Sequence, residues 1–267
     1  MRRLFLFFAV FCTISSITVY SQDIEVAPVR VNFSVTPGES QSRTVTVKNH
    51  SNRTETITLR LQDYLVPRQG GMELLPAGST RNSIASWVNL NPTFLVLQPN
   101  ESQTVQINLQ SPADDFSAKW GILSFATATE QTAFSADRQL QTGVVISGRI
   151  DIFLLYNPQT GDPGNVEINN LQETGVTASG QRTFSVNLDN LGERITACKV
   201  FLIASNIQTG EEHTFRPVDV TSYPQSARMV ELTLPNTLPP GRYALAAILD
   251  YPGSASLKGT QIMIRID

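Results

Sequence analysis

Few residues of this 267-residue chain have the types and spacing that catalysis requires. Its two histidines, His50 and His213, belong to different halves of the chain, and a Gly-x-Ser-x-Gly nucleophile motif does not occur. A structural zinc site would need several Cys or His residues at close spacing, which the sequence lacks. Acidic pairs such as Asp114-Asp115 stand in turn-like segments, where solvated loop charges are expected rather than a catalytic dyad. The sequence therefore predicts a protein that is not an enzyme and needs neither a metal nor another cofactor.

A strand-like segment at residues 143–156 is the feature that most favours binding. One face carries an apolar row with a glycine gap, and its members are Val144, Ile146, Gly148, Ile150, Ile152 and Leu154. The other face carries Val145, Ser147, Arg149 and Asp151. In one interpretation, the apolar row closes the core of its own domain. In the other, the strand is an exposed edge to which a partner strand adds, and Gly148 leaves space for a bulky partner residue.

The elements that position this segment are short alternating strands separated by turns. Residues 36–49 and 98–109 nearly repeat, and each begins with a Pro-Gly or Pro-Asn turn followed by an alternating strand. Side chains of a strand point alternately to its two faces, so this alternation predicts sheets with one buried face. No segment has a helical apolar period of useful length. The pattern predicts an all-β protein built from antiparallel sandwiches.

The chain divides into three parts. Residues 1–22 have a basic start, an apolar run too short to span a bilayer and a small polar end, as in a cleaved secretory signal peptide. Residues 23–157 form the first predicted domain, with strands at 25–33 and 118–128 among others. A linker rich in Pro and Gly follows, and residues 158–267 form the second domain. Its predicted strands include 165–170, 175–179 and 212–218.

Composition limits which binding partners and which cellular compartment are expected for this protein. Hydrophobic residues make up 41% and charged residues 16%, as in a globular protein. The net charge is −3, and it becomes −5 when Arg2 and Arg3 leave with the signal peptide, so nucleic acid is not an expected partner. Cys198 is then the only cysteine, which excludes an internal disulfide and predicts a buried thiol. We expect an exported protein of the bacterial periplasm.

Several motifs together resemble the periplasmic PapD-like pilus chaperones. They lie at residues 26–33, 44–49, 87–100, 103–107, 117–123, 152–158 and 238–251, and they span nearly all of the mature chain. The resemblance implies two immunoglobulin-like β-sandwich domains in tandem, joined in an L shape. It also implies that the last strand of the first domain is lent to an incomplete pilin subunit, whose C-terminal carboxylate is held by two basic residues in the cleft.

Only some of the basic residues that the resemblance implies are present at the matching positions of this sequence. Arg30 stands at the position of the family's first-strand arginine, so the resemblance gives it the carboxylate-holding role, for which charge-assisted donors are needed. Phe153 occupies the place of the second basic residue, and Arg149 lies four residues earlier on the same strand face as a candidate substitute. Asn157 replaces an arginine of an interdomain ion pair, and Gln106 stands where an arginine is common.

The sequence therefore predicts a periplasmic chaperone-like protein that binds secreted or surface-assembled, pilin-like subunits by strand donation along residues 143–154. The expected partner is an extracytoplasmic subunit with an exposed strand or a C-terminal carboxylate, and an outer-membrane assembly protein is a further candidate. The alternative is a structural or adhesive module of the cell envelope, with function in loops 67–78 and 130–141. Glycan binding would need exposed aromatics, and Trp87 and Trp120 are both expected in the core.

Overall fold

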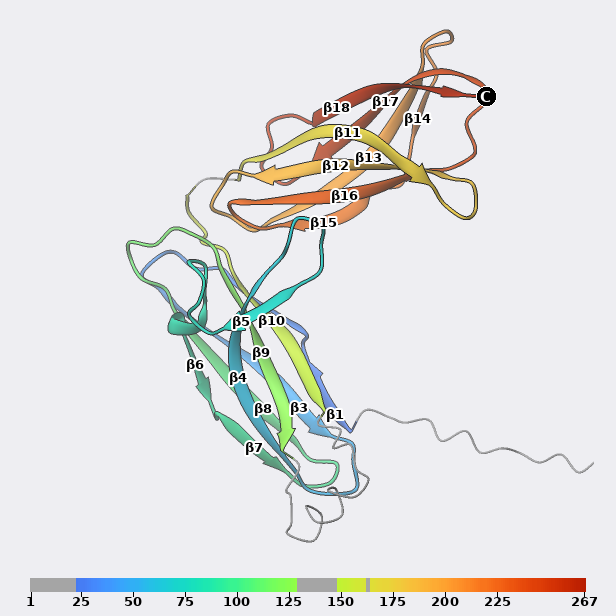
Figure 1. Cartoon of the computed structure of the whole chain (residues 1–267). Helices are drawn as coiled ribbons and strands as arrows, with labels where there is room; N and C mark the ends of the chain where they lie inside the picture. Colours follow the sequence, from blue (N-terminus) through green and yellow to red (C-terminus); the bar gives the residue numbers. More distant parts are fainter. Residues whose placement is uncertain (1–22, 129–147, 162–163) are drawn as a thin grey trace, which may run out of the picture.

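The computed structural model describes residues 23–128, 148–161 and 164–267. The predicted signal peptide therefore lies outside the described residues. The fold is all-β and consists of two β-sandwiches in tandem, set at an angle to each other, which confirms the predicted fold class (Figure 1). The described residues contain no helix that is long and apolar enough to cross a membrane.

The first sandwich contains strands β1 to β10. Their bounds are β1 (Ile24–Ala27), β2 (Arg30–Phe33), β3 (Ser40–Asn49), β4 (Glu55–Leu65), β5 (Glu73–Pro76), β6 (Val88–Asn91), β7 (Phe94–Leu97), β8 (Ser102–Gln110), β9 (Lys119–Ala128) and β10 (Arg149–Tyr156), with a 3-10 turn η1 (Ala85–Trp87) before β6. One sheet has the order β1-β3-β8-β6, and the other has the order β2-β10-β9-β4-β5, with β7 also paired to β4.

The second sandwich contains strands β11 to β18. Their bounds are β11 (Val166–Val176), β12 (Arg182–Asn190), β13 (Thr196–Asn206), β14 (Glu212–Thr214), β15 (Val218–Ser222), β16 (Ser226–Leu234), β17 (Gly241–Asp250) and β18 (Lys258–Ile266). One sheet is β11-β12-β16, and the other is β14-β13-β17-β18, with β15 also paired to β13. The predicted boundary after residue 157 stays a prediction.

The two near-repeats form equivalent turns in the first sandwich. In each, the residue after proline has a positive φ, 94° at Gly38 and 63° at Asn100, which glycine and asparagine tolerate best. A glutamate then caps each turn, because Glu39 accepts a hydrogen bond from the Thr36 N–H and Glu101 accepts one from the Gln98 N–H. The turns lead into β3 and β8, which pair with each other in antiparallel register.

The first predicted strand, at 25–33, is wrong in one respect, because it is two strands in different sheets. β1 pairs with β3, whereas β2 pairs in parallel with β10. The break falls at Pro28, which has no N–H to donate to a ladder, and the Ala27–Pro28 bond is cis. The sheet switch places Arg30 beside the end of β10, with Arg30 in register with Phe153.

Three other strand predictions are also corrected. The predicted strands at 165–170 and 175–179 are one strand, β11 (Val166–Val176), because its pairing with β12 continues through two register shifts. Residues 212–218 contain β14 and the start of β15, which both pair with β13. Sequence reading missed β5, a short edge strand that pairs with the end of β4.

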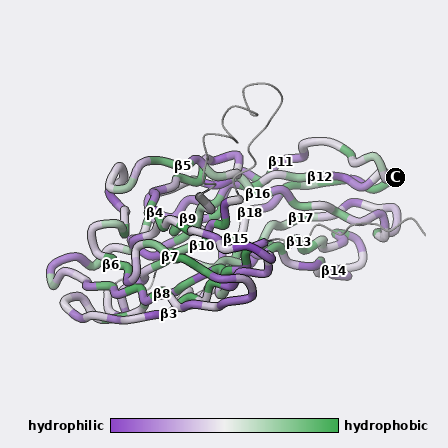
Figure 2. Tube along the Cα trace, turned by 90° about the horizontal axis from the view of Figure 1, so that it is seen from below, coloured by the Kyte–Doolittle hydropathy of each residue, from purple (hydrophilic) through white to green (hydrophobic). Residues whose placement is uncertain are grey.

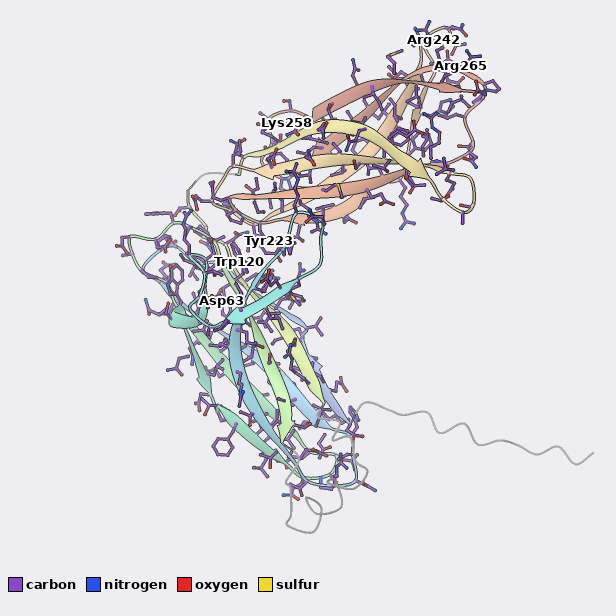
Figure 3. The ribbon with its side chains drawn as sticks, in the orientation of Figure 1. Asp63, Trp120, Tyr223, Arg242, Lys258 and Arg265 are labelled. Atoms are coloured by element: carbon purple, nitrogen blue, oxygen red, sulfur yellow. The ribbon has the colours of Figure 1, made fainter. Side chains whose placement is uncertain are left out.

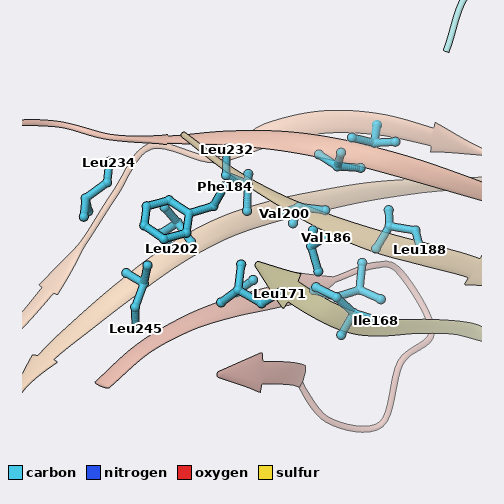
Figure 4. Close-up of a cluster of buried hydrophobic side chains, with 14 of the residues drawn as sticks. Ile168, Leu171, Phe184, Val186, Leu188, Val200, Leu202, Leu232, Leu234 and Leu245 are labelled. Carbon is cyan, nitrogen blue, oxygen red and sulfur yellow. The ribbon is translucent and has the colours of Figure 1, made fainter. Parts of the chain in front are cut away.

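Each sandwich buries its own apolar core. The alternation of hydrophobic and hydrophilic residues along the strands is visible in both (Figure 2). The second core, shown in Figure 4, gathers residues of facing sheets such as Phe184, Leu202 and Leu245. The first core includes Ile152 and Leu154 of β10. The end of β10 is therefore anchored inside the first sandwich.

Candidate functional site

Strand β10 is covered on both sides along only part of its length. Its residues from Arg149 to Tyr156 all pair with β9. On its other side, β2 pairs only with Phe153 to Tyr156. No described strand pairs with β10 on that side before Phe153. Within residues 23–128, 148–161 and 164–267, the segment Arg149–Ile152 is therefore an open sheet edge, and we call it the open half of β10.

Backbone groups of the open half point toward this edge. Hydrogen-bonding directions alternate along a strand, and the Phe153 N–H donates to the Val29 carbonyl on the β2 side at 3.0 Å. The N–H and C=O of Asp151 therefore face the same side, beyond the end of β2. The Gly148 carbonyl faces β9, where it accepts from the Thr127 N–H at 3.0 Å. An added strand would find its donors and acceptors at Arg149 and Asp151.

The predicted apolar row lies mostly inside the domain where it is described. Ile152 is fully buried in the first core, and Ile150 is partly buried against it. Their side chains pack against the protein's own sheet, because this face of β10 covers the core. Gly148 is exposed, and a Cβ there would meet only the Thr127 hydroxyl, at 3.6 Å. Val144 and Ile146 lie outside the described residues.

Arg30 is exposed beside β10 and rests on an aromatic support. Its guanidinium carbon lies 5.9 Å from the centre of the Phe153 ring, in a cation–π arrangement. Tyr64 contacts the same ring edge-on, with ring centres 5.7 Å apart. Phe153, which replaces the second basic residue expected from the resemblance, therefore orients Arg30 and adds no charge.

A cavity of about 570 Å³ lies between Arg30 and the second sandwich. Three further charged side chains line it, Lys199 of β13, Asp219 of β15 and Asp250 of β17. Lys199 is in register with both aspartates, so the three side chains share one face of the sheet. Sequence reading missed Lys199, because only the arrangement of the two sandwiches brings it opposite Arg30. Its alternation with the buried Cys198 and Val200 marked it as outward-facing but not as cleft-facing.

Arg149, the other predicted basic residue, is engaged on its own strand. Asp151 accepts from Arg149 Nη2 at 2.6 Å and from Nε at 3.1 Å. Arg149 is four residues from Phe153, the register partner of Arg30, which is about 13 Å along a strand. The predicted assistance of Arg149 to Arg30 stays a prediction.

The two sandwiches meet through a buried aromatic cluster. Tyr64 and Trp120 of the first sandwich pack with Tyr223 of the second. The Tyr64 and Tyr223 hydroxyls are hydrogen-bonded at 2.7 Å, and the Trp120 and Tyr223 ring centres are 5.0 Å apart. Trp120 Nε1 donates to the Tyr64 carbonyl at 3.0 Å. Trp120 and Tyr223 lie where the sandwiches meet (Figure 3). Because Tyr64 also contacts Phe153, the cluster continues to the aromatic ring that supports Arg30.

Polar contacts add to this junction. Asn157 Nδ2 donates to the Ile195 carbonyl at 2.8 Å, and the Ile195 N–H donates back to Asn157 Oδ1 at 3.0 Å. Asn157, at the place of the family's ion-pairing arginine, thus joins the sandwiches by neutral hydrogen bonds. Arg81 and Glu193 form an interdomain ion pair at 2.7 Å.

The loop after β4 also belongs to the junction. Its Arg68 carbonyl accepts a hydrogen bond from the Met229 N–H at the edge of β16, at 2.8 Å. The loop at 67–78, which the adhesive alternative uses for function, thus contacts the second sandwich. The loop at 130–141 lies outside the described residues.

The remaining candidates for chemistry are apart from the cleft or inert. His50 Nε2 contacts Glu25 at 2.6 Å, and His213 lies 3.3 Å from Glu211 in the other sandwich. Cys198 is 2% exposed, and burial raises the pKa of its thiol to about 11. In the described part of the chain, no three His, Cys, Asp or Glu residues gather as metal ligands would.

Two solved structures of fimbrial chaperone systems are similar to this chain in fold. A chain of the chaperone–tip adhesin complex of CFA/I fimbriae biogenesis is 11% identical, with a TM-score of 0.50 over 91% of this chain and 98% of its own. The class 5 fimbriae chaperone CfaA is 12% identical, with a TM-score of 0.50 over 90% of this chain and 98% of its own. No family model matches the sequence, and no curated protein matches it either. The resemblance to PapD-like chaperones is thus confirmed as a likeness of fold.

Proposed function

We propose, on the premise of the fold shared with the class 5 fimbriae chaperone CfaA, that this protein is a periplasmic chaperone for pilin-like subunits. It binds an extracytoplasmic subunit by adding a strand of that subunit to the open half of β10. The subunit's C-terminal carboxylate is held in the cleft by Arg30, and Lys199 is the second basic residue there. An outer-membrane assembly protein is the expected recipient of the subunit.

The observation that carries this proposal is the open half of β10. An unpaired edge invites association with other chains, so proteins usually cover or blunt such edges. Here β2 ends its pairing at Arg30 in register with Phe153, and the next backbone groups along β10 have no strand opposite them in the described residues. A client strand in line with β2 would continue the same sheet. Its end would then lie beside Arg30.

Proline substitution at Asp151 tests the edge directly. The Asp151 N–H faces the open side, so Asp151→Pro removes one donor for an added strand and leaves the ladder to β9 in place. Asp151→Ala is the matched control, because it removes the same carboxylate and keeps the N–H. We expect a client subunit to co-purify from periplasm with wild type and Asp151→Ala, and to be lost or greatly reduced with Asp151→Pro.

Two results would contradict the proposal. Equal recovery of the same subunit with all three proteins would mean that the open half of β10 is not the binding edge. Absence of any small β-rich subunit from the wild-type preparation would favour the alternative of a structural envelope module. Circular dichroism and urea unfolding of each variant establish that a lost subunit does not reflect a lost fold.

A further inference from the structure

The charges in the cleft extend the proposed function, on which the following inference rests. Arg30 contributes one positive charge from the first sandwich. The facing wall of the second sandwich carries one lysine between two aspartates, in register across β15, β13 and β17. That wall has a net charge of −1 from Asp219, Lys199 and Asp250. The cavity is therefore bipolar, with a positive side at β2 and a net negative side at the second sandwich.

In the described part of the chain, these four side chains have no ion-pair partner. Among the described residues, no salt bridge or side-chain hydrogen bond involves Arg30, Lys199, Asp219 or Asp250. Registered neighbours have Cβ atoms about 5 Å apart, so Lys199 can approach either aspartate, but its single charge balances only one of the two. One aspartate is left without a counter-charge. Counting only the residues that the structure describes, the cleft thus has a cation without an ion-pair partner on one side and a net negative charge on the other.

A bare carboxylate is a poor match for this cavity. A carboxylate drawn to Arg30 and Lys199 would also approach Asp219 and Asp250, and it would compete with them for the charge of Lys199. Like charges brought together in a partly desolvated site are unfavourable, and such repulsion is a common source of specificity. A ligand that brings its own cation to the aspartates removes this cost.

We infer that the cleft selects subunits whose C-terminal carboxylate is accompanied by a basic side chain in the last or next-to-last residue. The carboxylate binds between Arg30 and Lys199. The ammonium or guanidinium of the client pairs with the aspartate, Asp219 or Asp250, that Lys199 leaves without a counter-charge. A client with an acidic residue at that place is disfavoured, because its charge faces the same two aspartates.

Synthetic strand peptides can test this inference on the purified mature protein. The probes are fluorescein-labelled peptides with one alternating Val-Thr body and four endings, namely free Lys, amidated Lys, free norleucine and free Glu. Binding is followed by fluorescence anisotropy at low salt. Exposed ion pairs are individually weak, so we expect the free Lys ending to bind about 3- to 10-fold more tightly than the norleucine ending, and the Glu ending to bind most weakly.

Two variants test which side of the cavity binds the carboxylate of the peptide and which side binds its basic side chain. In Asp219→Asn/Asp250→Asn, the preference for Lys over norleucine and Glu should disappear, whereas preference for the free carboxylate over the amide should persist. In Arg30→Ala, the preference for the free carboxylate should weaken, whereas the preference for Lys should persist. Free lysine serves as a competitor. It should compete poorly, because it lacks the strand that pairs with β10.

The outcomes separate this inference from the proposed function. Carboxylate-dependent binding that is indifferent to the last side chain would overturn the inference and leave the chaperone mechanism standing. Binding that does not depend on the carboxylate, or no binding by any of the peptides, would count against both. Competition by free lysine as strong as by the peptide would show a site for a free basic amino acid, which would also overturn the inference.

Discussion

Replacing the two hydroxyls at the junction should reveal a strong coupling between the sandwiches. The Tyr64 and Tyr223 hydroxyls are 2.7 Å apart, and each is the other's sole hydrogen-bond partner in the described residues. Tyr223→Phe leaves the Tyr64 hydroxyl buried in a residue that is 1% exposed, and Tyr64→Phe leaves the Tyr223 hydroxyl in a residue that is 8% exposed. An unsatisfied buried polar group costs about 1–3 kcal/mol. We expect Tyr223→Phe to be the more destabilising change, because water reaches Tyr64 less easily.

The double variant provides the sharper expectation. Tyr64→Phe/Tyr223→Phe leaves no unpaired hydroxyl, and the rings keep their edge-to-face contact, with centres 5.7 Å apart. Its free energy of unfolding should lie within about 1 kcal/mol of wild type, since removing both partners of a hydrogen bond is nearly neutral. The two single costs should therefore not add. The coupling energy should be about 1–2 kcal/mol.

Urea unfolding followed by tryptophan fluorescence can measure these differences. Trp120 is close to the Tyr223 ring, so its emission reports on the junction itself. Tyr243→Phe is a suitable control, because the Tyr243 hydroxyl donates to the Pro239 carbonyl inside the second sandwich. In a Tyr64→Phe/Tyr243→Phe double variant, the losses in free energy of unfolding from the two substitutions should add. A double Tyr64/Tyr223 variant whose cost equals the sum of the single costs would refute the reasoning.

Four further predictions concern the site and its surroundings. Asn157→Asp should destabilise the junction by about 1–3 kcal/mol in urea unfolding at neutral pH, because a carboxylate would face the Ile195 carbonyl in place of a donor; unchanged stability would argue against the contact. Alkylation of Cys198 by iodoacetamide at pH 8 should be at least about 100-fold slower in the native protein than in urea, since the buried thiol has a pKa of about 11; equal rates would show an accessible thiol. Burial and the neighbouring Tyr223 raise the pKa of the Tyr64 phenol, so above pH about 10 this phenol loses its proton in the unfolded chain but keeps it in the folded protein. The free energy of unfolding of the wild type should therefore fall with pH in this range, by about 1.4 kcal/mol per pH unit more than that of Tyr64→Phe. Gly148→Val should leave the unfolding midpoint within error, because its Cβ would meet only Thr127 Oγ1 at 3.6 Å, and should reduce client recovery if Gly148 accommodates a partner side chain; unaltered recovery would exclude that role.

The sequence by itself determined the local elements of the protein. Alternation with period two and the turns at Pro37 and Pro99 are local properties, because they depend on a few neighbouring residues and on the backbone preferences of Pro, Gly and Asn. They were enough to predict an all-β chain of two sandwiches. The burial of Cys198 followed in the same way, from its place in an apolar alternating strand.

Long-range pairing decided the rest, since the partner of a strand is not encoded in the strand's own pattern. Residues 25–33 read as one strand, yet the chain changes sheets at Pro28, and only the pairing of β2 with β10 shows where the cover of β10 ends. The row of Ile150 and Ile152 was compatible with a core face and with a partner-binding face. The packing places both against the first core.

The cleft was beyond sequence reasoning for the same physical reason. Arg30 was identified from its position in a motif, but Lys199, Asp219 and Asp250 come from three separate strands of the other sandwich. Their meeting depends on how the sandwiches dock through Tyr64, a residue far from all of them in the sequence. A charge becomes part of a site when tertiary packing sets its distance to other charges, because electrostatic energy depends on distance and solvent exposure.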